Sequence, residues 1–322
     1  MKAIWWWPVY FLTLFLALVA CSPQLEPAAP AIPEIVAVET PLPSPSPLPS
    51  STPFQPQVPT ATIVPTEAPT PTPSLTPTPT PTFTPTWIYN EAGQVVAPIL
   101  LYHHIDGDLY SGRYYVSVPS FRAQMETLAS WGYTSITLST LLDALIEGAE
   151  LPARPVVITF DDGDLDVYEN AFPIMQELGF VGVFYIVSNR LESNGFVNVE
   201  QMQELLAAGW EIGSHGQTHV ELTGNHALAR SEILDSKLAL EEALGIKIES
   251  FAYPFGTIDA YLAQKVQDYG YRAAVGLGTG VTHTWSSLLY LQRVEVYGEY
   301  TLEQFTARLP WTATPAVEAP GQ

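Results

Sequence analysis

The chain has 322 residues, of which 33 are acidic and 12 are basic, so its formal net charge at pH 7 is −21. This balance argues against a nucleic-acid partner, because binding a phosphate backbone requires a basic surface. The single cysteine excludes an intramolecular disulfide, and the length allows one large domain with additional segments.

The N-terminal segment is a short apolar run that follows a basic residue. Lys2 precedes an apolar stretch from Ile4 to Ala20, which is either a signal peptide or a membrane helix. Its end, LVAC, finishes at Cys21 and resembles the lipobox of bacterial lipoproteins, in which the cysteine is lipidated after cleavage just before it. We therefore predict a lipoprotein signal peptide, with an uncleaved membrane anchor as the alternative. Both place the rest of the chain outside the cytoplasmic membrane.

Most of the 30 prolines lie in the next segment, in runs such as PTPTPSLTPTPTPTFTPT. Proline fixes φ and removes a backbone donor, and few bulky residues are present here to form a core. We interpret the segment as an extended, disordered Pro/Thr-rich linker. The predicted organisation is a signal peptide at 1–20, the linker at 21–86, a folded domain at 87–309 and a flexible tail at 310–322.

Strand-like apolar runs alternate with amphipathic helical stretches through the folded domain. The predicted strands are 97–102, 133–137, 155–160, 181–187, 210–215, 248–254, 271–276 and 291–296. The predicted helices are 118–132, 139–148, 166–179 with a kink or late start at Pro173, 197–209, 227–245, 258–270 and 301–309. Nearly continuous apolar strands between helices indicate a buried parallel sheet. About seven such units in roughly 220 residues favour an α/β barrel, whose chemistry lies at the carboxyl ends of its strands.

Two adjacent carboxylates and a glycine end the predicted strand at 155–160. Asp161 and Asp162 repel each other unless a cation or a proton lies between them, and Gly163 permits a sharp turn. A solvated Asp-Gly turn is the alternative for this motif taken alone.

Two histidines end a later predicted strand. His215 and His219 are four residues apart, so their rings converge if the segment makes one helical turn. Two imidazoles and one carboxylate suit a tetrahedral zinc site with an open position for water. A pair of surface histidines is the alternative, but the aspartates at another strand end favour the metal site. A third strand ends in FAYPFG (251–256). Aromatic residues around a proline can form the wall of a pocket, and a plain transition from strand to loop is the alternative.

These three segments, in this order, resemble the polysaccharide deacetylases of carbohydrate esterase family 4. The family's T-F-D-D-G motif is present at residues 159–163 and its [ST]-H-x-x-x-H motif at residues 214–219. The resemblance covers roughly residues 97 to 297. It implies a distorted (β/α) barrel of about seven parallel strands that hydrolyses N-acetyl groups on sugar polymers.

The resemblance also implies a role for each matching residue. Carried over by position, Asp161 is the general base, and the metal ligands are Asp162, His215 and His219. The implied metal is zinc, with cobalt or nickel as alternatives, and it would polarise the acetyl carbonyl and activate water. The substrate and oxyanion positions implied by the third motif are Tyr253, Pro254 and Phe255.

Two departures from the family pattern concern the base and the acid. The third motif usually contains an arginine that steadies the base, but residue 252 is alanine, so Arg293 is our candidate for that charge. The fifth motif normally supplies a histidine as general acid, but the matching sequence is Leu291-Gln292-Arg293. The fourth motif is not identifiable, and GLGTGVTHTW occupies its region.

The first predicted strand ends in Tyr102, His103 and His104. The family branch that includes poly-N-acetylglucosamine deacetylases also has Y-P-F-G in its third motif and a first strand ending in Tyr-His. The resemblance therefore implies His103 as the general acid. His283, which lies near a late predicted strand end, is the second choice. Because adjacent strand residues point to opposite sides, we expect His104 to pack or hydrogen-bond nearby. A purely structural role for both histidines is the alternative.

The leading functional prediction is a metal-dependent N-deacetylase that is lipid-anchored to the cell membrane and acts on an extracellular N-acetylglucosamine polymer. An O-acetyl esterase of xylan-type polymers is one alternative, because the same site can attack esters. A non-catalytic carbohydrate-binding lipoprotein that has lost its acid is the other. The expected partners are the polysaccharide and, through the lipid only, the membrane, with no nucleic acid.

Overall fold

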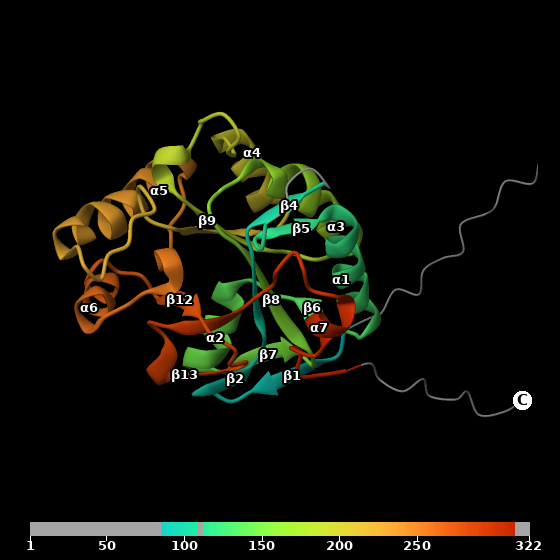
Figure 1. The fold of residues 1–322 in the computed structure, drawn as a ribbon. Coiled ribbons are helices and arrows are strands. Elements are labelled where there is room, and N and C mark those ends of the chain that lie inside the picture. The colour runs from blue at the N-terminus through green and yellow to red at the C-terminus, as the bar shows by residue number, and fades with distance from the viewer. Residues whose placement is uncertain (1–84, 108–111, 313–322) are drawn as a thin grey trace, which may run out of the picture. The chain divides into compact units, whose positions relative to one another are not determined.

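The computed structural model describes residues 85–107 and 112–312, and its centre is a closed ring of seven parallel strands (Figure 1). The strand order is β3-β14-β12-β11-β10-β9-β8, and pairing of β3 with β8 closes the ring. The predicted (β/α) barrel of about seven parallel strands is confirmed. The ring strands are β3 (Ile99–Tyr102), β8 (Pro155–Phe160), β9 (Val183–Ile186), β10 (Glu211–Ser214), β11 (Ser250–Ala252), β12 (Ala273–Leu277) and β14 (Leu291–Glu295).

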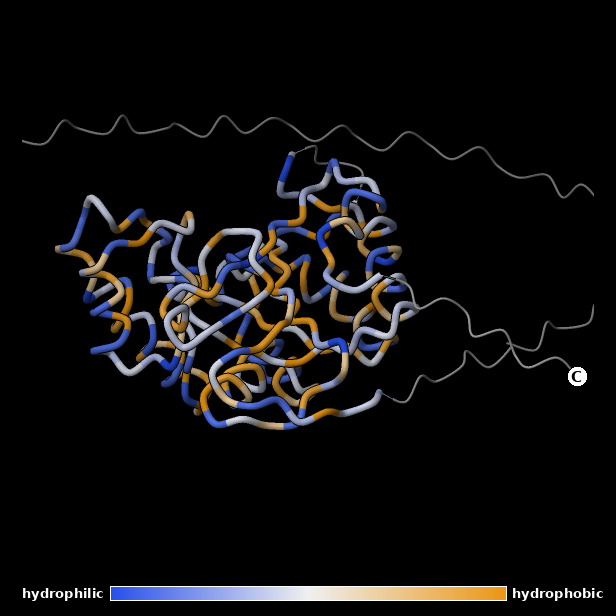
Figure 2. Tube along the Cα trace, turned by 90° about the horizontal axis from the view of Figure 1, so that it is seen from below, coloured by the Kyte–Doolittle hydropathy of each residue, from blue (hydrophilic) through white to orange (hydrophobic). Residues whose placement is uncertain are grey.

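Successive apolar side chains along the barrel strands alternate between two hydrophobic clusters. Val157 of β8 belongs to an inner cluster with residues of the other ring strands, whereas Ile158 belongs to an outer cluster that includes helix residues. This follows from the two-residue period of a strand, which directs successive side chains to opposite faces. Figure 2 shows hydrophobic and hydrophilic stretches alternating along the trace.

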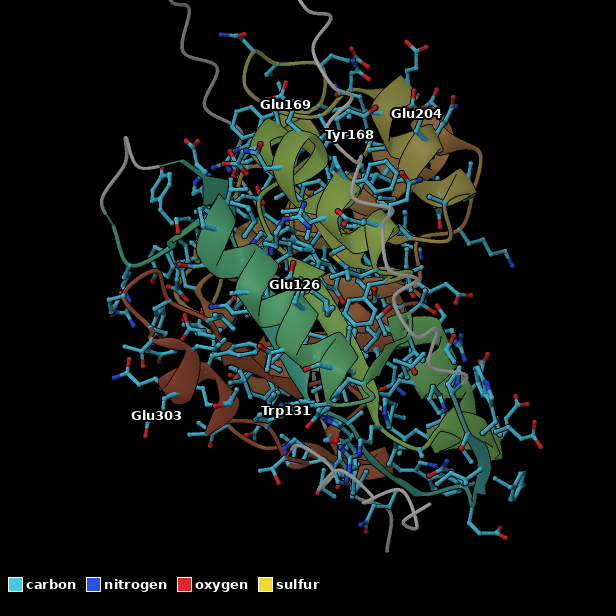
Figure 3. The ribbon with its side chains drawn as sticks, turned by 90° about the vertical axis from the view of Figure 1, so that its right-hand side faces the viewer. Glu126, Trp131, Tyr168, Glu169, Glu204 and Glu303 are labelled. Carbon is cyan, nitrogen blue, oxygen red and sulfur yellow. The ribbon has the colours of Figure 1, made fainter. Side chains whose placement is uncertain are left out.

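Helices cover the outer cluster. Helix α1 is representative, because it buries Phe121, Met125 and Leu128 while Glu126 points outward (Figure 3). The helices are α1 (Val118–Ser130), α2 (Leu138–Glu147), α3 (Phe172–Glu177), α4 (Val199–Ala207), α5 (Ser236–Leu244), α6 (Ala260–Asp268) and α7 (Leu302–Thr306). Helix α2 differs from the others, because its apolar side chains belong to the inner cluster and close one end of the barrel.

Short strands that the sequence analysis missed lie at the two ends of the barrel (Figure 1). At the end closed by α2, β1 (Trp87–Asn90) pairs antiparallel with β7 (Ala149–Pro152), and β2 (Gln94–Val96) with β13 (Thr282–Thr284). At the other end, β4 (His104–Asp106) pairs parallel with β5 (Tyr115–Ser117). The strand predicted at 133–137 is present as the short β6 (Thr134–Ser135), which pairs parallel with the start of β8 outside the ring. The strands that were missed at the two ends of the barrel are too short to give a clear periodic pattern.

Two predicted helices are divided in the structure. The helix predicted at 166–179, with a kink or late start at Pro173, begins as a π-helical turn, η1 (Val167–Ala171), and continues as α3 from Phe172, so the predicted irregularity at Pro173 is confirmed. Pro173 lacks the N–H that a continuous α-helix would use, which accounts for the break. The predicted helix at 227–245 is likewise divided into η3 (His226–Leu228), a π-helical turn η4 (Arg230–Asp235) and α5.

Several predictions fall at the limits of the described residues. The signal peptide, Cys21 and nearly all of the linker lie outside them, as does most of the predicted tail. Within the described ranges, no helix combines the length and apolar character needed to span a membrane. Trp311, which was predicted to lie in the tail, packs against Tyr133 with ring centroids 5.7 Å apart.

Candidate active site

The predicted reactive residues gather at the carboxyl ends of the barrel strands. Each strand carries its residue to the same rim, as expected for a parallel barrel. The residues concerned are His103 after β3, Asp161 and Asp162 after β8, His215 and His219 after β10, Phe255 after β11, and Arg293 on β14.

The three predicted metal ligands converge at this rim. Ligand atoms of Asp162, His215 and His219 all lie within 4.8 Å of one another. Nδ1 of His215 lies 2.9 Å from the carbonyl oxygen of Ala252, and since a carbonyl can only accept, Nδ1 carries the proton. Nε2 of His215 therefore keeps its lone pair, as a metal ligand must. One carboxylate and two imidazoles in this arrangement fit a divalent metal with an open coordination position.

Strained backbone conformations are concentrated at the same place. Asp162, His219 and Phe255 have φ values of 75°, 61° and 59°, in the left-handed region. Among the described residues, Glu192 is the only other non-glycine residue with positive φ. Such conformations cost on the order of 1–3 kcal/mol each and persist where the surrounding structure imposes them. The surrounding fold therefore holds the loops of the site in conformations that they would not otherwise prefer.

Asp161 is buried and held by Arg293. Nη1 of Arg293 donates to Oδ1 of Asp161 at 2.6 Å, and Nη2 donates to Oδ2 at 2.7 Å. Burial acts to raise the pKa of Asp161, but the charge and hydrogen bonds of Arg293 outweigh it and hold that pKa well below its usual range. Arg293 thus makes the ion pair expected of it. The Asp161 carboxylate is therefore ionised at neutral pH and fixed in orientation.

His103 lies beside the cluster. Its ring is within electrostatic range of Asp161 and Asp162, and burial lowers its pKa while these two carboxylates act to raise it. The ring of Tyr114 lies 4.6 Å from the His103 ring. The role of His103 as the general acid stays a prediction.

His104 has separate partners. Its Nδ1 lies 2.8 Å from Oδ2 of Asp166, and its ring stacks on Tyr115 with centroids 4.1 Å apart. Burial disfavours the charged imidazole, but the hydrogen bond with Asp166 and the charges of Asp164 and Asp166 outweigh this and raise the pKa of His104. His104 is therefore hydrogen-bonded next to the site, as expected.

Two residues of the third motif, Tyr253 and Pro254, are buried, and one, Phe255, is exposed. Tyr253 was predicted to contact substrate, but it is buried and its ring packs on Phe251 at 5.3 Å. Both belong to the outer cluster because they alternate with Ala252, which faces the barrel interior. Pro254 is also buried and begins the short turn η5 (Pro254–Gly256). Phe255 is 56% exposed, with its ring 4.7 Å from that of His219, so it forms the wall of the site.

The remaining histidines do not belong to the cluster. His283, the second choice for the acid, is buried on β13, and its Nε2 lies 3.0 Å from the carbonyl oxygen of Ala97. Ala97 precedes β3, so His283 is at the opposite end of the barrel, and that choice was wrong. His226 is exposed, pairs with Asp259 at 2.6 Å and stacks on Tyr261.

Sequence reasoning missed two residues that hold a ligand or the loop that carries one. Glu232 of η4 is 2% exposed, and its carboxylate accepts from the backbone N–H groups of Gln217 and Thr218 at 2.8 and 2.9 Å. It therefore holds the loop between the two histidine ligands. Arg190 donates to Oδ1 of Asp162 at 3.1 Å. The only sequence signal for Glu232 is a charged residue beside apolar ones in a predicted helix.

The comparisons with known proteins agree with this geometry. Residues 148–274 match the family described as polysaccharide deacetylase, and the match contains the T-F-D-D-G segment and both histidine ligands. Residues 148–274 therefore form a polysaccharide deacetylase domain. YxkH of Bacillus subtilis, named for the same family, is 28% identical over 200 residues, which are 62% of this chain and 71% of that protein.

Two further proteins are similar to this chain. The poly-beta-1,6-N-acetyl-D-glucosamine N-deacetylase of Staphylococcus epidermidis is 26% identical over 161 residues, which are 45% of this chain and 55% of that enzyme. The chain therefore spans little more than half of the staphylococcal protein. The crystal structure of a polysaccharide deacetylase from Bacillus cereus superposes with a TM-score of 0.61 at 27% identity, covering 67% of this chain and 69% of that one.

Proposed function

We propose that this polysaccharide deacetylase removes N-acetyl groups from an extracellular polymer of N-acetylglucosamine. The observation that carries the proposal is the ligand cluster beside an ion-paired carboxylate. Nε2 of His215 lies 3.5 Å from Oδ2 of Asp161, so the carboxylate and the ligand set border the same space. The name of the Staphylococcus epidermidis relative supports the substrate class.

Asp162, His215 and His219 would hold a divalent metal, zinc in our proposal, with cobalt or nickel as alternatives. When bound, such an ion polarises the acetyl carbonyl and lowers the pKa of water. A ligand set of two imidazoles and one carboxylate is typical of catalytic zinc sites.

The side chains of the protein divide the proton transfers between them. Asp161, kept ionised by Arg293, accepts the proton of the attacking water. We assign the backbone N–H of Phe255 as a donor to the developing oxyanion, as the family resemblance suggests. The leaving amine then needs a proton, and His103 donates it from beside Asp161 and Asp162. Burial lowers the pKa of His103, and these two carboxylates oppose that shift without outweighing it.

Acetate release by four forms of the protein tests the reaction. We expect wild type with zinc or cobalt to release acetate from poly-N-acetylglucosamine or chitooligosaccharides, and Asp161→Asn and His103→Ala to lose at least about a hundredfold in kcat. His226→Ala is the control, because His226 lies outside the cluster. Release from acetylxylan alone would indicate an esterase, and metal binding without release from any polymer or peptidoglycan would contradict catalysis.

The proposed location is the outer face of the cytoplasmic membrane, with a lipid on Cys21. Its support is the sequence LVAC after a short apolar run. Cys21→Ala should release the protein from the membrane fraction and abolish labelling by a fatty-acid probe. A membrane-bound Cys21→Ala variant would instead indicate an uncleaved anchor.

A further inference from the structure

Aromatic side chains lead away from His103 over the rim of the barrel. Tyr114 is 41% exposed, and its ring is the one that lies 4.6 Å from His103. The ring of Tyr297 follows at 6.2 Å from Tyr114, and that of Tyr300 at 5.1 Å from Tyr297. The proposed reaction uses none of these three tyrosines.

An arginine is held between two of these rings. Cζ of Arg113 lies 4.0 Å from the ring centroid of Tyr297 and 5.4 Å from that of Tyr114. The backbone N–H of Gly298 donates to the carbonyl oxygen of Arg113 at 2.9 Å, which ties the two chain segments together. A stacked guanidinium loses little further freedom when its N–H groups bind a ligand. Arg113 is exposed, so these donors are available at the surface.

The position of these residues connects them to the site. Tyr297 and Tyr300 follow β14, which pairs with β3, the strand that immediately precedes His103. They therefore lie at the carboxyl-terminal rim, as the ligand cluster does. A polymer whose reacting sugar sits at the cluster would extend its neighbouring sugars over this rim.

We propose that Arg113, Tyr114, Tyr297 and Tyr300, which we call the aromatic strip, bind the sugars that flank the reacting sugar on the His103 side. The inference rests on the proposed function and specifies the substrate as a saccharide chain rather than a single sugar. A pyranose presents an apolar C–H face that packs on the electron-rich face of an aromatic ring. Hydroxyl and acetamido oxygens at the ring edge accept hydrogen bonds from a guanidinium.

Matched tyrosine variants of the full chain test the strip. Tyr114→Ala should raise KM for long oligosaccharides about tenfold, equivalent to about 1.4 kcal/mol, with little change for the shortest substrate that reacts. Tyr114→Phe keeps the ring and should retain most of the affinity. The control is Tyr89→Ala, because Tyr89 is 60% exposed on β1 at the opposite end of the barrel. Arg113→Ala should act in the same direction as Tyr114→Ala.

Polymer binding by the same variants in an Asp161→Asn background separates the strip from catalysis. We expect Tyr114→Ala to weaken this binding and Tyr89→Ala to leave it unchanged. Equal effects of the two substitutions, or no polymer binding by the Asp161→Asn parent, would overturn the strip. Binding that depends on Tyr114, without acetate release by wild type, would uphold the strip and contradict only the proposed deacetylation.

Discussion

At the scale of single residues, an arginine pairs with the buried Asp161, but it stands at a different position from the arginine of the family pattern. Position 252, where the family's arginine usually stands, is alanine, and Ala252 faces the barrel interior. Arg293 reaches the same carboxylate from β14 and is 1% exposed. Because a buried carboxylate without a partner is costly, the loss of one arginine is tolerated only where another supplies the charge.

Arg293→Ala should therefore damage both stability and activity. Removing one partner of a buried ion pair costs about 3–5 kcal/mol, since Asp161 would stay buried and unpaired. We expect a lower free energy of unfolding by denaturant titration and a large loss of kcat. The double variant Asp161→Asn/Arg293→Met removes both charges, so it should regain part of the stability and none of the activity. Wild-type stability in Arg293→Ala would contradict this account of the pair.

His104 should give the protein a pH-dependent contribution to stability. The hydrogen bond with Asp166 and the nearby carboxylates raise its pKa above 6.5, so the folded state favours the protonated imidazole. The stabilisation is fully present below the unfolded pKa of about 6.5 and is lost as the pH rises through the raised folded pKa. We expect His104→Gln to lower Tm more at about pH 6 than at about pH 9. A Tm difference that is independent of pH would show that the protonated form makes no special contribution.

At the scale of elements, two π-helical turns lie next to carboxylates that hydrogen-bond residues of the site. η4 carries Glu232, and η1 begins one residue after Asp166, the partner of His104. A π-helical turn adds a residue to the helical repeat, which changes the direction of the side chains that follow. In both cases the turn accompanies a carboxylate that contacts the loops of the site.

Glu232→Gln should weaken metal binding more than it weakens the fold. The amide keeps the shape but places an N–H donor where the carboxylate accepts from the loop at 216–218. The loop that carries His219 would then lose its fixed conformation, and we expect about a tenfold loss of zinc affinity in a competition titration. Glu211→Gln is the control, because this largely buried glutamate binds Ser139 at the other end of the barrel. Equal zinc affinities for the two variants would mean that Glu232 serves stability alone.

At the scale of the whole molecule, long buried strands and their polar ends were predictable from sequence. The run at 155–160 and the acidic pair after it identify a barrel strand and its reactive end, because period and spacing are local properties. Tyr253 and His283 were assigned wrongly, since the side to which a residue at a short strand points depends on pairing across the sheet. Glu232 contacts a loop fourteen residues away through the fold, and no local pattern indicates such a contact.

The C-terminal limit of the folded domain gives a final prediction, because the contacts continue beyond α7. Tyr133 donates its hydroxyl hydrogen to the carbonyl oxygen of Trp311 at 2.7 Å and accepts from the Trp311 N–H at 3.0 Å. Arg154 donates to the carbonyl oxygen of Thr312 at 2.9 Å. We expect a chain that ends at Thr312 to match the Tm of the full chain. A chain that ends at Leu309 should lose about 1–3 kcal/mol, or several degrees of Tm, because these bonds and the stacked ring are removed. Equal Tm values for the two truncations would place the domain limit at Leu309, where the sequence pattern put it.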